Sequence, residues 1–511
     1  MIFDHLRLAT EDRRTLRKAN EEQEQELTRL REDLALERQR AYGTSSEQSK
    51  DPSTADAATE ADANSSSFKA PSNARRGGGN AGRKPLPKTL PEVERRYEQP
   101  KCLNCGSEDL VAIGEDTARS LVIVPETFCS RKTVQVKYVC RCCKKNTTAP
   151  APRQAIPGSS FGSPEFVAHV ATHKYYFGMP NYRQVIRLNA LGKPFGLRFN
   201  RTTLNNLMIG AADLFTPICE YMHQELLTQA ALHADETIMQ VLNEPGKTAQ
   251  SISYMWGYRS TKHAERPVVY FDYQPSRAGI HAANFLRKED GSRYNGWVHT
   301  DGYAAYDKIA EGKRIGCAAH VRRKFEVICK VVGKLDGNGS LSAQMLDFFR
   351  KLYAVEKDTK DLDPDTRAAI RRQICEPILK EMYDWLDHYE PLVLPKSPLG
   401  RAIHYAREHL PAVARYLEDG RLALDNNIME RAIKMVVIGR KNWLFAHSQD
   451  GAVANAVMYT MVQSAIANGI DPYRYLVTVL ERLPQAKTAA DVQALLPWAL
   501  KDELSADAQG S

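Results

Sequence analysis

The first forty residues repeat apolar positions at helical spacing among many charges. Residues 4–41 contain neither Gly nor Pro, and their leucines fall on two seven-residue registers. The registers consist of Leu6, Asn20, Leu27 and Leu34, and of Leu16 and Leu30. Polar residues interrupt both registers, so an oligomerising coiled coil and a lone solvated helix stay open. We expect a coiled-coil helix over residues 1–43.

A different pattern, with alternating or short apolar runs, covers residues 230–333 and predicts strands. The expected strands are Ala231–Leu242, Ser253–Tyr258, Val268–Tyr273, a short one through Trp297 and Val298, and another reaching Cys317. Helices are expected at about residues 279–288 and from His320 onward. Three antiparallel-type strands followed by alternating helices and strands predict a mixed α/β sheet.

Helical periodicity dominates the remaining ordered segments. In residues 153–229, a helix at Asn181–Leu188, a break at Gly192 and a capped helix from Asn200 resemble a helix-turn-helix. Two core helices explain the same pattern equally well. Further along, the expected divisions are a helical insertion at 334–421, a last core helix within 422–448 and a C-terminal helical element at 449–511.

Residues 44–100 lack the apolar content that a folded core requires. Their first part is rich in Ser, Ala, Asp and Asn, and the part after residue 74 is basic. This composition predicts a flexible basic linker. Within it, Arg83 and Lys84 precede Pro85 in a segment that suits a narrow DNA minor groove, although a solvated linker explains them too.

Two cysteine pairs flank a segment of strand-like alternation and predict a zinc ribbon over residues 101–152. The pairs are Cys102 with Cys105 and Cys140 with Cys143, each separated by two residues. This gap lets both thiolates face one tetrahedral ion. Cys142 is an alternative to Cys143 as fourth ligand, and reduced thiols without metal are the competing interpretation.

Three carboxylates occupy comparable positions at the ends or on the faces of expected elements. Asp301 directly follows a core strand, Asp235 lies within one, and Glu430 follows a helix start that Asp425 or Asn426 would cap. Rigid carboxylates of this kind suit a hard metal ion. A turn at Asp301 and an ion pair between Glu430 and a nearby lysine are the simpler alternatives.

Composition narrows the class of protein. The chain has 511 residues, too many for one core, and a formal net charge of +8, which is compatible with a polyanionic partner. It contains no apolar run long enough to span a membrane and no apolar segment typical of a signal peptide. We therefore expect a cytoplasmic protein without a membrane partner.

Several motifs together make the chain resemble the DDE transposases of the insertion sequence 66 family. The motifs are His233-Ala-Asp235-Glu-Thr237, Tyr273-Gln-Pro-Ser-Arg277, Thr300-Asp301-Gly-Tyr-Ala-Ala-Tyr306, Ala319-His320-Val-Arg-Arg-Lys-Phe325, Asp425-Asn-Asn-Ile-Met-Glu430-Arg-Ala-Ile433 and Gly439-Arg-Lys-Asn-Trp443. The likeness extends to the charged leading helix, the basic linker and the cysteine pairs. It covers nearly the whole chain.

The resemblance implies a ribonuclease-H-like core, divided into residues 230–333 and 422–448. It implies that Asp235, Asp301 and Glu430 are the catalytic carboxylates and hold two Mg²⁺ or Mn²⁺ ions. The implied reaction is cleavage at the ends of an insertion element and joining of the freed 3′-hydroxyls to target DNA. A catalytically silent DNA-binding regulator and a nuclease without strand transfer remain the alternatives.

Partners follow from the same resemblance and from basic side chains. We expect binding to the element's terminal repeats and to target DNA, with nucleoid association, a homo-oligomer, and accessory proteins from the same element. Arg322 and Arg323 are candidate phosphate contacts, and a solvated helix face is their alternative. Arg440 and Lys441 lie in a basic and aromatic cluster that suits nucleic acid, or equally a surface beside a core.

Overall fold

The computed structural model describes residues 126–139, 141–142, 146–303, 306, 313–332 and 340–506. The chain divides into two compact units, one of residues 44–131 and one of residues 1–43 and 132–511. The expected coiled coil, the basic linker with Arg83 and Lys84, and the zinc thiolates Cys102, Cys105, Cys140 and Cys143 lie outside the described residues. Of the first unit, residues 126–131 are described, without helix or strand.

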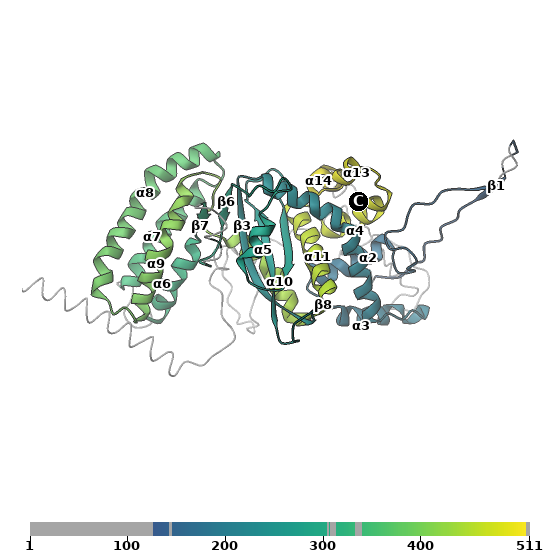
Figure 1. The fold of residues 1–511 in the computed structure, drawn as a ribbon, viewed down its shortest axis with the longest axis horizontal. Coiled ribbons are helices and arrows are strands. Elements are labelled where there is room, and N and C mark those ends of the chain that lie inside the picture. The colour runs from purple at the N-terminus through teal and green to yellow at the C-terminus, as the bar shows by residue number, and fades with distance from the viewer. Residues whose placement is uncertain are drawn as a thin grey trace, which may run out of the picture. The chain divides into compact units, whose positions relative to one another are not determined.

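A mixed sheet forms the centre of the second unit (Figure 1). Its strands are β3 (Ala231–Asn243), β4 (Ile252–Ser260), β5 (Val269–Gln274), β6 (Trp297–His299), β7 (Arg314–Ile315) and β8 (Ala446–Ser448). The order is β5-β4-β3-β6-β7, antiparallel among the first three and parallel among the last three. β8 pairs in parallel with the far end of β3. The mixed α/β architecture predicted from the sequence is confirmed.

Edge strand β5 is covered by a helix rather than left open. Helix α11 (Gln449–Ala467) packs along it, and two of its hydroxyls replace a missing neighbouring strand. Thr460 Oγ1 accepts from Phe271 N at 2.9 Å, and Ser464 Oγ accepts from Val269 N at 3.0 Å. These bonds satisfy backbone groups that an exposed edge would offer to other chains.

The two faces of the sheet carry different helices. Helix α10 (Asn427–Trp443) packs on β3 and β4, where Gly257 lets it approach closely because a Cβ there would collide with Met429. On the other face, Phe285 of α5 (Gly279–Phe285) stacks on Tyr258 with ring centroids 3.6 Å apart. The helix expected over residues 279–288 therefore forms but ends three residues earlier.

Four long helices follow β7 and build a core of their own. They are α6 (Ala318–Val332), α7 (Leu341–Asp358), α8 (Pro364–Tyr389) and α9 (Pro398–Ala414), with short η5 (Glu390–Leu392) and η6 (Arg415–Leu417) turns. Ser340, Asp363 and Ser397 each cap the helix that follows by accepting from a backbone N–H. Phe325, Phe349 and Leu386 belong to the apolar cluster that joins these helices. Helices occupy most of the described residues from 340 to 421.

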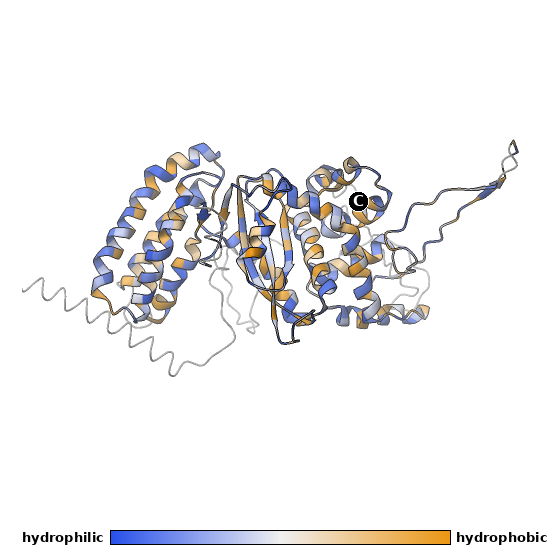
Figure 2. Cartoon of the chain, in the orientation of Figure 1, coloured by the Kyte–Doolittle hydropathy of each residue, from blue (hydrophilic) through white to orange (hydrophobic). Residues whose placement is uncertain are grey.

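The remaining helices precede and follow the sheet in sequence. Before it come a hairpin of β1 (Lys137–Val139) and β2 (Asn146–Thr148), then α2 (Pro164–Tyr175), α3 (Asn181–Gly192), η2 (Lys193–Phe195) and α4 (Arg201–Thr228). After α11 come α12 (Pro472–Arg482), η7 (Leu483–Gln485), α13 (Ala489–Gln493) and α14 (Pro497–Ala506). Hydrophobic and hydrophilic residues alternate around most helices (Figure 2). Among the described residues, no helix is both long and apolar enough to cross a membrane.

Candidate active site

Strand register brings two of the three predicted carboxylates to adjacent positions. In the parallel pairing of β3 with β6, Leu232 lies opposite Val298 and His233 opposite His299. Continuing this register by two residues sets Asp301 across from Asp235. Side chains at paired positions of neighbouring strands share one face of a sheet. The sheet therefore directs both carboxylates to the same region.

Local hydrogen bonds hold each of these carboxylates by one oxygen. Asp301 Oδ1 accepts from Tyr303 N at 2.9 Å, the bond of an Asx turn. Asp235 Oδ1 accepts from Glu236 N at 2.8 Å. The turn predicted as the simpler alternative at Asp301 is thus present. It orients the carboxylate, and within the described residues no hydrogen bond reaches its second oxygen.

Helix α10 carries Glu430 in its first turn, and a buried amide ties the start of this helix to β3. Asn426 Nδ2 donates to Ala234 O at 2.9 Å, and His233 Nδ1 donates to Asn426 Oδ1 at 2.8 Å. The backbone group bonded by Asn426 thus immediately precedes Asp235. Because Gly257 pairs with Asp235 across β3 and β4, α10 approaches the sheet at this same level.

Of the two expected capping residues at α10, Asp425 makes the bond. Asp425 Oδ1 accepts from Asn427 N at 3.1 Å, and Tyr353 donates to its other oxygen at 2.8 Å. Asn426 stands at the cap position but makes no side-chain cap bond, because its amide is bonded to β3.

Burial and crowded negative charge perturb Asp235. Burial raises the pKa of Asp235 well above its ordinary value, and the nearby carboxylates of Glu236, Asp301 and Glu430 raise it further. The bond from Glu236 N opposes this shift but does not outweigh it. A buried acid surrounded by like charges favours a proton or a cation as its neighbour.

Glu430 faces cationic and neutral donors without a short hydrogen bond. His320 Nδ1 lies 3.6 Å from Glu430 Oε1, and Arg323 Nη2 lies 3.9 Å from Oε2. Among the described residues, the buried Oε1 atom has no hydrogen-bond partner. Within the described parts of the chain, the expected alternative pair between Glu430 and Lys434 is not among the ion pairs. Within the described residues, one ligand atom each from Glu430, Cys317 and His320 lie within 4.8 Å of one another, whereas Asp235 and Asp301 belong to no such group.

A second cluster beside the carboxylates was missed by sequence reasoning. Arg277 donates to Glu236 Oε1 through Nε at 2.6 Å, and Tyr306 donates to Oε2 at 2.8 Å. The Glu236 side chain is only 2% exposed, whereas that of Arg277 is 43% exposed. Arg277 also stacks on Tyr303, with its guanidinium carbon 4.0 Å from the ring centroid. A fixed, half-exposed guanidinium therefore lies next to Asp301.

The sequence held a weak signal for this cluster. The motif from Tyr273 to Arg277 contributes to the family resemblance, but nothing in it shows which residue Arg277 contacts. Glu236 adjoins Asp235 on β3, and its carboxylate accepts from both Arg277 and Tyr306.

The predicted DNA contacts differ in their surroundings. Arg323 lies near Glu430, and Arg322 lies 3.8 Å from Glu326 on its own helix. Arg440 is bonded to Thr237 Oγ1 at 3.2 Å and to Ile238 O, while Lys441 is exposed. Trp443 packs near Tyr175 and Tyr459. In the basic and aromatic cluster, Trp443 therefore packs against the core while Lys441 faces solvent.

Three segments of the chain match sequence profiles of transposase domains. Residues 99–144 match a zinc-finger binding domain of transposase IS66, residues 29–95 a profile described as transposase C of IS166 homeodomain, and residues 460–498 the IS66 C-terminal element. These matches define a DNA transposase. A profile of the transposase IS66 family covers residues 159–454, more than half of the chain. The chain belongs to the transposase IS66 family.

Three relatives come from Sinorhizobium fredii (strain NBRC 101917 / NGR234). The uncharacterized protein y4jD is 28% identical over 429 residues, which cover 81% of each chain. The uncharacterized proteins y4qI and y4hP are each 28% identical, over 81% and 82% of this chain and 76% and 77% of their own lengths. No solved structure matches the chain.

Family membership carries consequences at a general level. It implies an enzyme that cleaves DNA and uses divalent metal ions, and the zinc-finger match implies zinc. It also makes DNA the partner of the chain.

Proposed function

We propose that this chain cuts the ends of its insertion element and joins the freed 3′-hydroxyls to target DNA, using Asp235, Asp301 and Glu430. The observation that supports the proposal is the parallel β3–β6 register, which pairs His233 with His299 and, if continued by two residues, leads to Asp235 and Asp301. The bond from Asn426 to Ala234 supports it by fixing the helix of Glu430 at the same level. The bond between Asn426 and Ala234 joins residues that are 192 positions apart.

We also propose a ribonuclease-H-like core. It is supported by the strand order β5-β4-β3-β6-β7, with three antiparallel strands followed by two parallel ones. In this proposal, α10 is the last core helix and α7 to α9 belong to an insertion before it. The zinc ribbon and the leading coiled coil remain proposals from the sequence.

The three carboxylates would hold the divalent ions. When bound, Mg²⁺ or Mn²⁺ activates the attacking oxygen and stabilises the oxygen that leaves phosphorus. The sheet keeps Asp235 and Asp301 rigid, so that little rearrangement is needed on binding. Arg277, held by Glu236, is suited to bind a non-bridging phosphate oxygen and to orient the phosphodiester.

The chemistry consists of two balanced displacements at phosphorus. In the first, water replaces the 3′ oxygen of the element end, leaving a 3′-hydroxyl and a 5′-phosphate. In the second, that 3′-hydroxyl attacks a target phosphodiester, so that one bond to phosphorus forms as another breaks. A hydroxyl that is already bound and oriented meets a lower entropic barrier to attack than free water does.

The test uses purified chain, labelled duplexes of the element ends, a target plasmid and Mg²⁺. Asp301→Asn is expected to abolish cleavage while end binding stays intact, because the amide is a poor ligand for a hard cation. Asp272→Asn is the matched control, since Asp272 is also a partly buried carboxylate of the sheet, on β5. Equal cleavage by Asp301→Asn and wild type would refute the role.

The same assay separates the alternatives. Joined products in the plasmid identify a transposase, and cleavage without joining identifies a nuclease. A chain that binds ends but cuts none with either Mg²⁺ or Mn²⁺ would be a silent regulator.

A further inference from the structure

We infer that the exposed face of α3, with the turn that follows it, is a binding surface for double-stranded DNA. This inference deepens the proposed function by assigning a surface to the DNA partner, and it rests on that function for the source of the DNA. None of the basic residues predicted from the sequence as DNA contacts lies on this surface.

The charge of this surface is uncompensated. From residue 166 to residue 212 the chain contains no Asp or Glu. Inside this stretch, the 19 residues from 183 to 201 include four exposed cations: Arg183, Lys193, Arg198 and Arg201. In the part of the chain that the structure describes, none of the four is in an ion pair with a carboxylate. A cationic surface without internal partners is complementary to a polyanion.

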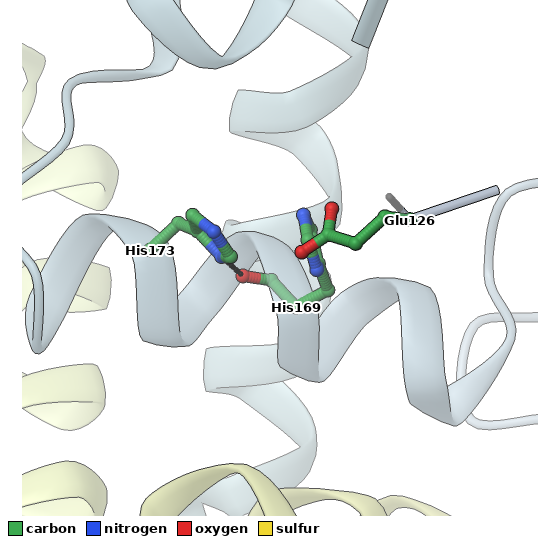
Figure 3. Close-up of side chains that lie close together, drawn as sticks. All are labelled: Glu126, His169 and His173. Atoms are coloured by element: carbon green, nitrogen blue, oxygen red, sulfur yellow. Dashed lines mark hydrogen bonds between the residues drawn. The ribbon is translucent and has the colours of Figure 1, made fainter. Parts of the chain in front are cut away.

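Arg187 is a fifth cation on α3 but is engaged with other side chains. His169 and His173 lie one turn apart on α2, and His173 Nδ1 donates to His169 O at 2.9 Å (Figure 3). Arg187 Nη1 lies 3.4 Å from the Nε2 atoms of both histidines. This residue therefore anchors α3 to α2, and we leave it out of the proposed surface.

Polar bonds fix the opposite face of α3 to its neighbours. Gln184 Nε2 donates to Val170 O and Met179 O, at 3.2 Å and 3.1 Å. Asn181 Nδ2 donates to Asn205 Oδ1 on α4 at 2.6 Å. Phe199, buried after the turn, stacks on Phe166 with centroids 5.5 Å apart. The surface is therefore carried by a rigid support, which is favourable for recognition.

Apolar side chains project between the cations. Tyr182 is 59% exposed, Ile186 54% and Phe195 56%. Arg201 reaches back over the Tyr182 ring, 6.0 Å from its centroid, and so joins the start of α4 to α3. Exposed aliphatic and aromatic groups among cations suit contacts with thymine methyl groups and sugars, which a merely solvated face does not need.

The structure favours α3, rather than α4, as the helix that contacts DNA. In a helix-turn-helix the second helix lies in the major groove, which would be α4. However, α4 packs against α2, β5, α11 and α13, and apolar residues are buried along its whole length. Helix α3 has its main contacts with α2, α4 and η2, and Figure 1 shows it at the margin of this helical group. At 12 residues, α3 has about the length that a major groove admits.

The test measures binding of the full chain to a labelled 30-base-pair duplex (about three helical turns) without added divalent metal. The double variant Arg183→Gln/Arg198→Gln is expected to bind about tenfold more weakly near 150 mM salt. Its salt dependence should be shallower by about 2 in log–log slope, because each phosphate contact contributes about 0.9. The matched control, Arg372→Gln/Lys380→Gln, removes the same charge from exposed positions of α8.

A second measurement uses a photo-crosslinking residue in place of Tyr182, with Ile374 on α8 as the matched position. We expect a DNA adduct at residue 182 and none at residue 374. Equal weakening by the two charge variants, or displacement of the duplex by polyglutamate as readily as by unlabelled DNA, would overturn the inference. Binding needs no cleavage, so a failed Asp301→Asn test would leave this result readable by itself.

Discussion

At the scale of single residues, Asp235 lies in a buried, negatively charged environment that destabilises its ionised form. Burial raises its pKa, and three other acidic residues add to the shift. A carboxyl group with a raised pKa in the folded chain destabilises the fold above its ordinary pKa. That penalty shrinks as the pH falls below the pKa of the folded state, and it vanishes below the ordinary pKa, where the carboxyl group is neutral in both states.

Asp235→Asn should therefore separate stability from activity. Without added divalent metal at pH 7, we expect Tm to rise by about 2–4 °C, the shift that about 1 kcal/mol gives in a large chain. Cleavage should fall by about 10²-fold or more, since a proposed ligand of the divalent ions is lost. Differential scanning calorimetry from pH 7 to pH 4 should show the Tm gain shrinking with acidity. A variant less stable than wild type at pH 7 would contradict the electrostatic explanation.

Arg277 offers a second prediction for a single side chain. Arg277→Ala removes a half-exposed guanidinium beside Asp301, and cleavage should fall by about 10- to 100-fold with folding retained. Arg277→Lys should recover only part of the rate, because an ammonium cannot keep both the bond to Glu236 and the stack on Tyr303. The measurement is single-turnover cleavage at saturating DNA.

The control for Arg277 is Arg266→Ala, which removes an exposed arginine paired with Glu225. If both alanine variants cleave at the wild-type rate, the prediction is wrong and Arg277 has no role in cleavage.

At the scale of elements, helices complete the sheet through few but specific bonds. The hydroxyls of α11 satisfy the N–H groups of edge strand β5, and the side chain of Asn426 ties α10 to β3. Losing one of these bonds leaves a buried backbone group unpaired. The cost of such a group exceeds the net value of an ordinary hydrogen bond.

Thr460 and Thr478 form a matched pair that isolates this cost. Each donates from Oγ1 to the carbonyl four residues earlier in its own helix, at 2.9 Å and 3.0 Å. Only Thr460 also accepts from Phe271 N. We expect Thr460→Val to lower the free energy of unfolding by about 1–3 kcal/mol and Thr478→Val to change it by less than about 0.5 kcal/mol. Urea unfolding of both variants provides the comparison, and equal losses would contradict it.

The sequence predicted elements better than it predicted the contacts between them. Strands β3, β4 and β5 and helix α10 were expected because their period and capping residues are local signals. The bond between His233 and Asn426 joins positions 193 residues apart, and no local pattern encodes it. The link between Glu236 and Arg277 was missed for the same reason. Asp301 could be predicted as a site residue because its turn and its strand are adjacent in sequence.

At the scale of the whole molecule, the carboxylates come from both sides of a long helical excursion. Asp235 and Asp301 belong to the sheet, whereas Glu430 follows only after α6 to α9. The segment that returns from α9 to α10 is held by Arg371, which is fully buried. Its guanidinium donates to the carbonyls of Tyr416, Asp419 and Leu422, at 3.1, 3.1 and 2.8 Å. Arg371 thereby fixes the approach to Glu430 without touching it.

Substitution of Arg371 should consequently affect both stability and cleavage. Arg371→Met removes the ion pair with Glu356, whose Oε2 lies 2.7 Å from Arg371 Nη2, and leaves three buried carbonyls without this donor. We therefore expect the unfolding free energy to fall by about 3–5 kcal/mol. Cleavage should fall at temperatures where the variant is still folded, because the return segment no longer holds the start of α10. Arg372→Met changes the neighbouring, exposed arginine and should leave both quantities nearly unchanged. A variant at Arg371 that loses stability but cleaves at the wild-type rate would show that α10 is positioned by its contacts with the sheet alone.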